Sequence, residues 1–158
     1  MNKTNAIRKL DTEKIQYEIF EYPTDGSIDA ISVAHYLNEN PAQVFKTLVT
    51  QSGTRMNYVF VVPGCNELDL KKAAKVVNEK SIELIPQKQL LPLTGYIHGG
   101  CSPIEMKKLF KTVIDVTARN YEYIYVSAGK VGMQIKINSN DLLKVVNGEY
   151  GEISKWNM

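Results

Sequence analysis

A lysine stands inside an apolar run of the sequence, Val44-Phe45-Lys46-Thr47-Leu48-Val49, and is the first candidate for chemistry. If the run is a strand, alternation places Lys46 on the same face as Val44 and Leu48. The lysine stem could then cover apolar surface while the ammonium stays in water. Alternatively, the ammonium could point into a cleft and hold an anion or a polarised carbonyl. Both interpretations are open on this residue alone.

A glycine-rich loop, Gly99-Gly100-Cys101-Ser102-Pro103, is the second candidate. Two glycines permit backbone conformations closed to other residues, and successive N–H groups in such a turn can bind an oxyanion or a phosphate. Ser102 adds a hydroxyl. Pro103 suits the first turn of a helix, which we expect from Ile104 to Phe110. The structural alternative is a tight connection between a strand and that helix.

The third candidate is the segment Ser127-Ala128-Gly129-Lys130-Val131-Gly132, which lies between two predicted strands. Ser127 could donate a hydrogen bond at the edge of a pocket. The structural alternative is a glycine hairpin that carries an exposed lysine.

Other catalytic arrangements have little support. The sequence lacks a Gly-x-Ser-x-Gly nucleophile elbow. His35 falls on the apolar side of a predicted helix and is expected in the core. Cys101 lies close to His98, but no third group that would orient a Cys/His pair is evident. Two histidines and no Cys-x-x-Cys pair predict no metal site, and the absence of Gly-x-Gly-x-x-Gly and Walker motifs predicts no nucleotide cofactor.

Bulk properties favour one globular domain over residues 1–158, because the chain has 158 residues of which 44% are hydrophobic. No stretch is long and apolar enough for a transmembrane helix, and Met1 to Lys9 lack the apolar core of a signal peptide. We therefore expect a cytoplasmic protein without membrane contact. The formal net charge of +2 neither identifies nor excludes a nucleic-acid binder.

The candidate residues must be positioned by six or seven strands with short helices between them. This pattern predicts an α+β domain with a mixed, largely antiparallel sheet and flanking helices. We expect strands at 15–22, 44–50, 57–63, 81–85, 112–116, 122–127 and 133–137. We expect helices or helical turns at 5–10, 27–37, 40–41, 68–78, 87–91, 104–110 and 140–147, the last capped by Ser139.

Taken together, these motifs resemble the YbaK family of aminoacyl-tRNA deacylases, which is related to the editing domain of bacterial prolyl-tRNA synthetase. The resemblance covers nearly the whole chain, and it rests on the order and spacing of the motifs. They are the strand at 15–22, Gln43 to Leu48, Leu68 to Lys72, Gly95-Tyr96, Gly99 to Pro103, Ile114-Asp115, Ile124 to Lys130 with Gly132, and Asp141-Leu142.

The resemblance implies a compact, partly curled α/β domain that hydrolyses the ester between an amino acid and the 3′ adenosine of tRNA. The implied substrate is Cys-tRNA(Pro), with Cys-tRNA(Cys) as a further one, and the implied partner is prolyl-tRNA synthetase. Lys46 matches the key lysine of the family. The pocket residues that it implies are Tyr22, Gly99, Cys101, Pro103, Ser127 and Gly129. Gln134 stands where the family often has an acidic residue.

The family mechanism lets the thiol of the cysteinyl ester attack its own carbonyl, so the protein needs no nucleophile. It needs to position the aminoacyl group and to offer donors to the oxyanion. Backbone N–H groups near Gly100 and Ser102 are expected in that role. Three alternatives are open: an Ala-tRNA(Pro) deacylase that uses a positioned water, a module that binds tRNA or a synthetase without catalysis, and a small-molecule hydrolase.

Overall fold

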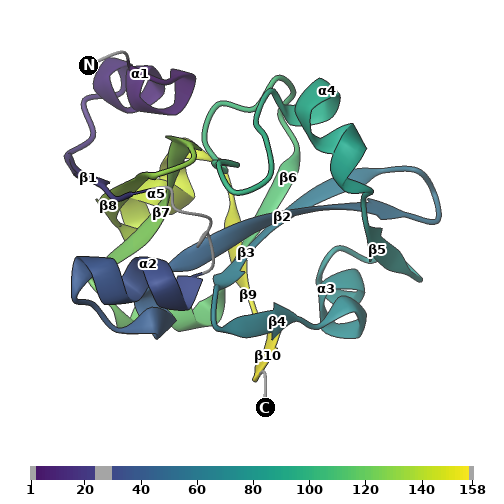
Figure 1. The fold of residues 1–158 in the computed structure, drawn as a ribbon. Helices are drawn as coiled ribbons and strands as arrows, with labels where there is room; N and C mark the ends of the chain where they lie inside the picture. Colours follow the sequence, from purple (N-terminus) through teal and green to yellow (C-terminus); the bar gives the residue numbers. More distant parts are fainter. Residues whose placement is uncertain (1–2, 24–29, 157–158) are drawn as a thin grey trace.

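The computed structural model describes residues 3–23 and 30–156, and Figure 1 shows their arrangement. Its helices are α1 (Asn5–Thr12), α2 (Ala30–Leu37), α3 (Leu70–Val76), α4 (Leu90–Thr94) and α5 (Ser139–Val145). Three 3-10 turns are η1 (Pro41–Gln43), η2 (Gln87–Gln89) and η3 (Val116–Asn120). The strands are β1 (Tyr17–Glu21), β2 (Phe45–Ser52), β3 (Asn57–Pro63), β4 (Asn66–Leu68), β5 (Ile82–Leu84), β6 (Lys111–Asp115), β7 (Tyr123–Lys130), β8 (Met133–Asn138), β9 (Glu149–Gly151) and β10 (Ser154–Trp156).

The strands form a five-stranded sheet in the order β5-β2-β3-β6-β9, a three-stranded sheet β1-β8-β7 and a two-stranded pair β10-β4. Only β3–β6 and β6–β9 pair in parallel among the described strands. A single parallel bridge between Val44 and Tyr125 joins the two larger sheets at the start of β2. The predicted α+β fold with largely antiparallel pairing is therefore confirmed, with the strands divided among separate sheets.

The main core lies between the two larger sheets and is closed by α1 and α5. Phe45, Val61 and Ile114 reach it from the five-stranded sheet, and Ile124 and Ile135 from the three-stranded sheet. Ile7 and Leu10 of α1 are fully buried against the same cluster, as is Leu142 of α5. Such burial of apolar side chains is the main force that holds the sheets together.

The β2–β3 hairpin, predicted from the alternating run and the apolar run that follows it, is confirmed. Lys46 pairs with Val62 and Leu48 with Phe60 across the hairpin. Leu48, Phe60 and Val62 pack in a second apolar cluster with α3, whereas Phe45 belongs to the main core. Lys46 thus shares its strand face with aliphatic residues, as the alternation predicts.

The prediction of a helix at 104–110 is wrong, because that segment has no regular secondary structure. Ile104 is fully buried in the main core, and Glu105 adopts a left-handed φ of 56°. The hydroxyl of Tyr96 donates a hydrogen bond of 2.6 Å to the carbonyl of Ile104. These tertiary contacts outweigh the local preference that followed from Pro103.

Three smaller expectations also need correction. The final helix is capped by Asn138, whose side chain accepts from the N–H groups of Asn140 and Asp141, while the hydroxyl of Ser139 donates to the Tyr121 carbonyl. His35 is exposed on α2. Residues 66–68 form β4 before α3 begins, and β9 and β10, of three residues each, were not expected. The helix expected at 27–37 is confirmed from Ala30 to Leu37 by α2, and residues 27–29 lie outside the described residues.

Within the described ranges, no helix has the length and apolar character needed to cross a bilayer.

The C-terminal segment is tied to the sheet by Asp115, a buried carboxylate at the end of β6. Its Oδ1 accepts from the N–H groups of Ile153 and Ser154, both at 3.1 Å, and its Oδ2 accepts from the N–H and the hydroxyl of Thr117. We expect Asp115→Ala to lower the free energy of unfolding by about 3 kcal/mol, because it leaves several donors without a partner. Urea unfolding measures this change.

The matched control is Asp69→Ala, which removes the more exposed cap of α3 and should cost about 1 kcal/mol. An Asp115 variant that is no less stable than the Asp69 variant would contradict this role for Asp115.

Candidate functional site

A pocket of about 330 Å³ lies against one edge of β2, between that strand and the segment around Gly99. It is lined by Val33, Val44, Phe45, Lys46, Thr47, Leu48, Gly64, Leu90, His98, Gly99, Cys101, Ser127 and Gln134. The lining comes from α2, β2, α4, β7, β8 and two loops, so distant parts of the chain meet here.

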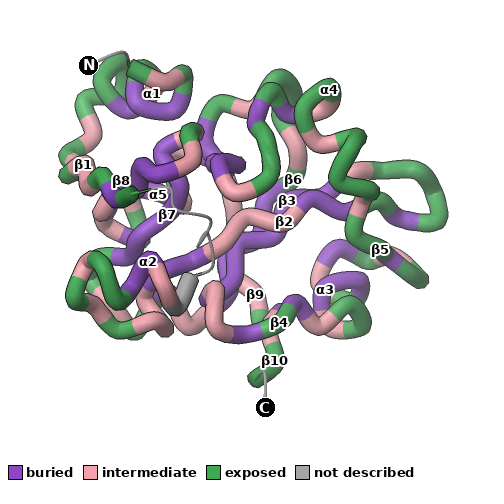
Figure 2. Tube along the Cα trace, in the orientation of Figure 1, coloured by how far each residue is buried: buried purple, intermediate pink, exposed green. Residues whose placement is uncertain are grey.

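The pocket exists because the outer edge of β2 is only partly paired. β3 pairs with β2 along its length, but β5 pairs only with Thr50 to Ser52 on the other side. The carbonyl of Val49 accepts from Ile85 on this outer edge. Because alternate residues of a strand face the same neighbour, the main chain of Thr47 faces the pocket. Figure 2 shows the half-buried stretch of β2 that results, between two buried stretches.

Lys46 places its ammonium at the wall of this pocket. The side chain is half-buried, and Nζ donates to the carbonyl of Gly64 at 3.3 Å. The N–H of Gly64 in turn donates to the carbonyl of Val44 at 2.7 Å, which fixes this acceptor. Burial lowers the pKa of Lys46 from its ordinary value, although the charge of Glu67 opposes the change. The remaining ammonium hydrogens are available to a ligand.

Two buried side-chain oxygens in the pocket have no hydrogen-bond partner, Oγ1 of Thr47 and Oε1 of Gln134. No other buried side-chain oxygen or nitrogen in the described parts of the chain lacks one. Such a group costs about 1–3 kcal/mol, so its persistence requires an explanation. Both residues line one pocket, but both oxygens are covered by other atoms, so a ligand could bond with them only after a change of side-chain rotamer.

Gln134 is held in place by strands on both sides. It pairs with Phe20 of β1 and with Ser127 of β7. Its Nε2 lies 3.5 Å from the hydroxyl of Tyr22, a long hydrogen bond that turns Oε1 the other way. Tyr22, expected in the pocket, is not among the residues that line it, but its hydroxyl accepts this bond from Gln134.

Ser127 lines the pocket at the point where β7 becomes irregular. The ladder between β7 and β8 shifts register between Ser127 and Lys130. The hydroxyl of Ser127 accepts from the N–H of Gly129 at 3.1 Å, which leaves its own hydrogen free to be donated. Gly129 itself faces Tyr96, since a Cβ there would lie 2.8 Å from that ring, and it does not line the pocket.

Only part of the glycine loop reaches the pocket. Gly99, with a left-handed φ of 84°, and Cys101 line it. The N–H of Gly100, expected to serve an oxyanion, donates to the Ile97 carbonyl at 3.0 Å. A Cβ on Gly100 would lie 2.8 Å from the backbone nitrogen of Val131, so glycine is needed for close packing against the β7–β8 hairpin.

Ser102 and Pro103 also lie outside the pocket lining. Ser102 is fully buried, and its hydroxyl accepts from the N–H of Ile104 at 3.2 Å. Pro103 is buried and lies at a separate hollow with Phe110 and Val146. Among the residues of this loop that line the pocket, the N–H groups of Gly99 and Cys101 are without an intramolecular partner in the described structure.

The pocket holds no activated nucleophile. Cys101 is 8% exposed, and burial raises the pKa of its thiol to about 12. A thiol at neutral pH is a poor nucleophile, since the thiolate is the reactive form. Within residues 3–23 and 30–156, no three His, Cys, Asp or Glu side chains group as metal ligands would. The site therefore offers a cation, hydrogen-bonding groups and shape.

Sequence reasoning missed Thr47 and Gln134 as pocket residues with open hydrogen-bonding capacity. Thr47 follows Lys46 in the same run, but alternation predicts that the two side chains diverge. They share the pocket because it lies at the open edge of the strand. Only the pairing of β2 shows this, and no local pattern contains it.

Comparisons with known proteins agree with one another. Residues 27–145 match the family model described as an aminoacyl-tRNA editing domain. The chain is 44% identical over 153 residues to EbsC of Enterococcus faecalis, a protein named as a candidate Cys-tRNA(Pro)/Cys-tRNA(Cys) deacylase; the match covers 96% of this chain and 93% of EbsC.

Two solved structures share the fold. A candidate trans-editing enzyme for prolyl-tRNA synthetase superposes with a TM-score of 0.85 at 21% identity, over 98% of this chain and 99% of the other. The hypothetical protein APE2540 superposes with a TM-score of 0.86 at 16% identity, over 94% and 97%.

The state of Cys101 is open to a direct test. We expect iodoacetamide at neutral pH to modify the half-exposed Cys65 at least about tenfold faster than Cys101, because Cys101 is buried and protonated. The single-cysteine variants Cys65→Ser and Cys101→Ser separate the two rates by mass spectrometry. Faster modification of Cys101 would show an activated thiol and restore a Cys/His mechanism.

Proposed function

This chain belongs to the aminoacyl-tRNA editing domain family, and from that membership we propose that it is a deacylase that removes cysteine from mischarged Cys-tRNA(Pro), with Cys-tRNA(Cys) as a further substrate. The observation that carries the proposal is a pocket with a half-buried ammonium and two unpartnered oxygens, but no nucleophile. Such a pocket suits a substrate that carries its own nucleophile.

The aminoacyl end of the tRNA would enter the pocket beside Lys46. Its ammonium attracts the ester carbonyl oxygen, which gains negative charge in the reaction. The N–H groups of Cys101 and Gly99, on the segment across the pocket from β2, would be further donors. Oε1 of Gln134 and Oγ1 of Thr47, both covered in the free protein, would become acceptors for the amino group of the substrate after a change of side-chain rotamer. These contacts would hold the aminoacyl group in one conformation.

Within that conformation the substrate thiol loses its proton and its sulfur attacks the carbonyl carbon of the same residue. The bond between that carbon and the 3′ oxygen of the adenosine breaks, and the 3′ oxygen takes up a proton. The products are a small cyclic thiolactone, which water opens to cysteine, and tRNA with a free 3′ end. Correct positioning of reacting groups can supply roughly 7–11 kcal/mol.

Selectivity follows from the same chemistry. Serine has nearly the shape of cysteine, but its hydroxyl is a much weaker nucleophile than a thiol at neutral pH. The enzyme therefore rejects seryl esters by reactivity, without a need for the pocket to exclude them. Alanine has no nucleophile in its side chain and is rejected on the same ground.

The second candidate function is an Ala-tRNA(Pro) deacylase that uses a positioned water. One observation favours it: the lining of one pocket includes two side chains with unpartnered oxygens, Thr47 and Gln134, and a rotation of either side chain would let it hold a water as the nucleophile. The experiment below separates the two.

A synthetase partner agrees with the low net charge. With 19 basic and 17 acidic residues, the chain has little charge with which to attract tRNA over long distances. Prolyl-tRNA synthetase, which produces the mischarged tRNA, would supply the additional contacts. This role places the protein in the cytoplasm, where aminoacyl-tRNA is made.

The test is deacylation of tRNA(Pro) charged with cysteine, alanine or serine. We expect release of cysteine only, and we expect Lys46→Ala to lower its rate at least about 100-fold, as loss of an oxyanion-stabilising group does. Rapid release of alanine would instead support the water mechanism. Release of none of the three would exclude both deacylase functions.

Two further variants make the Lys46 result specific. Lys46→Arg keeps the positive charge on a bulkier group and should recover part of the activity. Lys144→Ala removes an exposed lysine on α5, outside the pocket, and should act like the unmodified protein. Thermal unfolding of each variant excludes a loss of fold as the cause. Full activity of Lys46→Ala would refute the proposed role of Lys46.

A further inference from the structure

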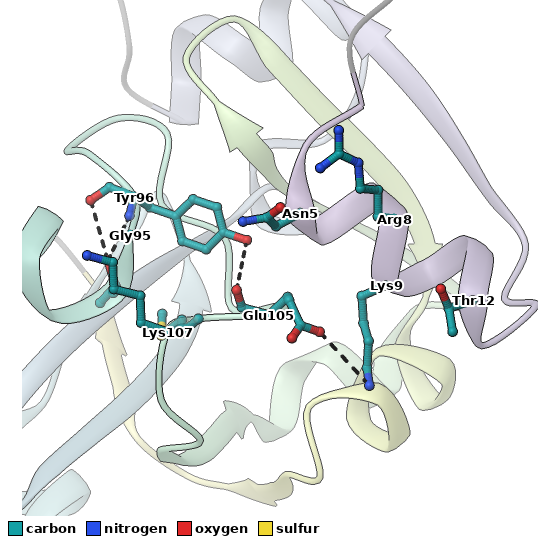
Figure 3. Close-up of a pocket in the computed structure, with 10 residues that line it drawn as sticks. Asn5, Arg8, Lys9, Thr12, Gly95, Tyr96, Glu105 and Lys107 are labelled. Carbon is teal, nitrogen blue, oxygen red and sulfur yellow. Dashed lines mark hydrogen bonds and ion pairs between the residues drawn. The ribbon is translucent and has the colours of Figure 1, made fainter.

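A second cleft, of about 680 Å³, lies between α1 and the segment from Thr94 to Lys107, and the reaction proposed above does not use it. Figure 3 shows the ring of Tyr96 in this cleft, with Asn5, Arg8 and Lys9 of α1 across from it. Glu105 and Lys107 line it from the same side as Tyr96.

The cleft carries an excess of positive charge. Arg8, Lys9 and Lys107 line it together with a single carboxylate, that of Glu105. Lys9 is already engaged, since its Nζ lies 3.0 Å from Glu13 and 3.9 Å from Glu105. Arg8 and Lys107 form no ion pair or side-chain hydrogen bond with any residue that the structure describes.

The walls of the cleft are held firmly in place. The Tyr96 hydroxyl donates to the Ile104 carbonyl at 2.6 Å. The N–H of Lys107 donates to the Thr94 carbonyl at 3.0 Å, and the lysine stem packs close to Gly95. Arg8 and Lys107 lie on opposite sides of the Tyr96 ring in Figure 3. Two free cations are thus presented at separate points of one preformed cleft.

The same segment separates this cleft from the candidate site. Thr94, Gly95 and Tyr96 line the cleft, and His98, Gly99 and Cys101, a few residues on, line the pocket beside Lys46. A polyanionic chain whose end lies in the pocket could therefore pass over this segment and place phosphate groups in the cleft. Arginine and lysine are the side chains that contact nucleic-acid phosphates most often.

We propose that this cleft binds phosphodiester groups of the acceptor strand, close to the 3′ end of the tRNA. The inference rests on the proposed function for the identity of the RNA, but its test does not depend on catalysis. Arg8 and Lys107 supply the attraction, and Glu105 opposes it. Contacts at two fixed points would set the direction in which the strand enters the pocket.

The experiment measures binding of uncharged tRNA(Pro) by the full chain at several salt concentrations, starting at low salt. We expect Arg8→Gln and Lys107→Gln each to weaken binding about threefold or more and to reduce the salt slope by about one unit. Glu105→Gln removes the opposing charge at nearly constant shape and should strengthen binding. A structural defect would not produce changes of opposite sign.

Lys75→Gln, on the exposed side of α3, is the matched control and should not change the affinity. Equal weakening by Lys75→Gln would show diffuse attraction and overturn the proposal, as would the absence of RNA binding at low salt. Displacement of the tRNA by millimolar inorganic phosphate at constant ionic strength would also overturn it, since the cleft would then be a site for a free anion. The tRNA in this experiment carries no amino acid, so its binding can be interpreted even if the deacylation assay fails.

Discussion

The incomplete pairing of β2 is the constraint on which the site depends. One edge of the strand is paired with β3 throughout, while the other edge pairs with β5 only from Thr50, and the one bridge to β7 lies at Val44, just before the strand. The stretch between must be covered without a neighbouring strand. The segment around Gly99 and the bent end of β7 lie across this gap, and the pocket is the space that they leave. Consequently Lys46 and Thr47, whose side chains leave opposite faces, both line it.

The chemistry of the pocket is defined by what surrounds the substrate. Lys46 is half-buried and anchored to Gly64, Gln134 is held between two strands, and Ser127 is bonded to Gly129. Each of these groups is fixed before any ligand arrives, which favours stabilisation of developing charge. Burial keeps the one thiol of the pocket, Cys101, protonated. The proposed mechanism agrees with these observations, because the protein holds the aminoacyl group in place and the thiol of the substrate acts as the nucleophile.

Much of the fold was predictable because its main elements have strong periodic patterns. The alternation around Lys46 and the apolar run at 57–63 identified the central hairpin, and the motifs together pointed to the correct family. The three-residue strands β4, β9 and β10 are too short for such patterns. The segment after Pro103 was predicted as a helix because proline favours a first turn, but burial of Ile104 and the hydrogen bond from Tyr96 decided its path.

Prediction of the site was limited by hydrogen bonding that no sequence pattern records. Lys46, Gly99, Cys101 and Ser127 line the pocket, but the Gly100 N–H donates to the Ile97 carbonyl, and Ser102 is fully buried outside the pocket lining. A glycine loop in a sequence offers several N–H groups, and only the folded chain shows which of them are free. The sequence singled out Gln134 only because the family often has an acidic residue there. The structure adds that its Oε1 is buried without a hydrogen-bond partner.

The most direct test of the central claim compares tRNA(Pro) charged with cysteine and with 2-aminobutyrate, in which a methyl group replaces the thiol. The two side chains have nearly the same size, so the pocket should hold both. If the thiol of the substrate is the nucleophile, the enzyme should release cysteine and leave 2-aminobutyrate attached, at a rate lower by at least about 100-fold. Comparable release of both amino acids would show that water is the nucleophile and would contradict the account.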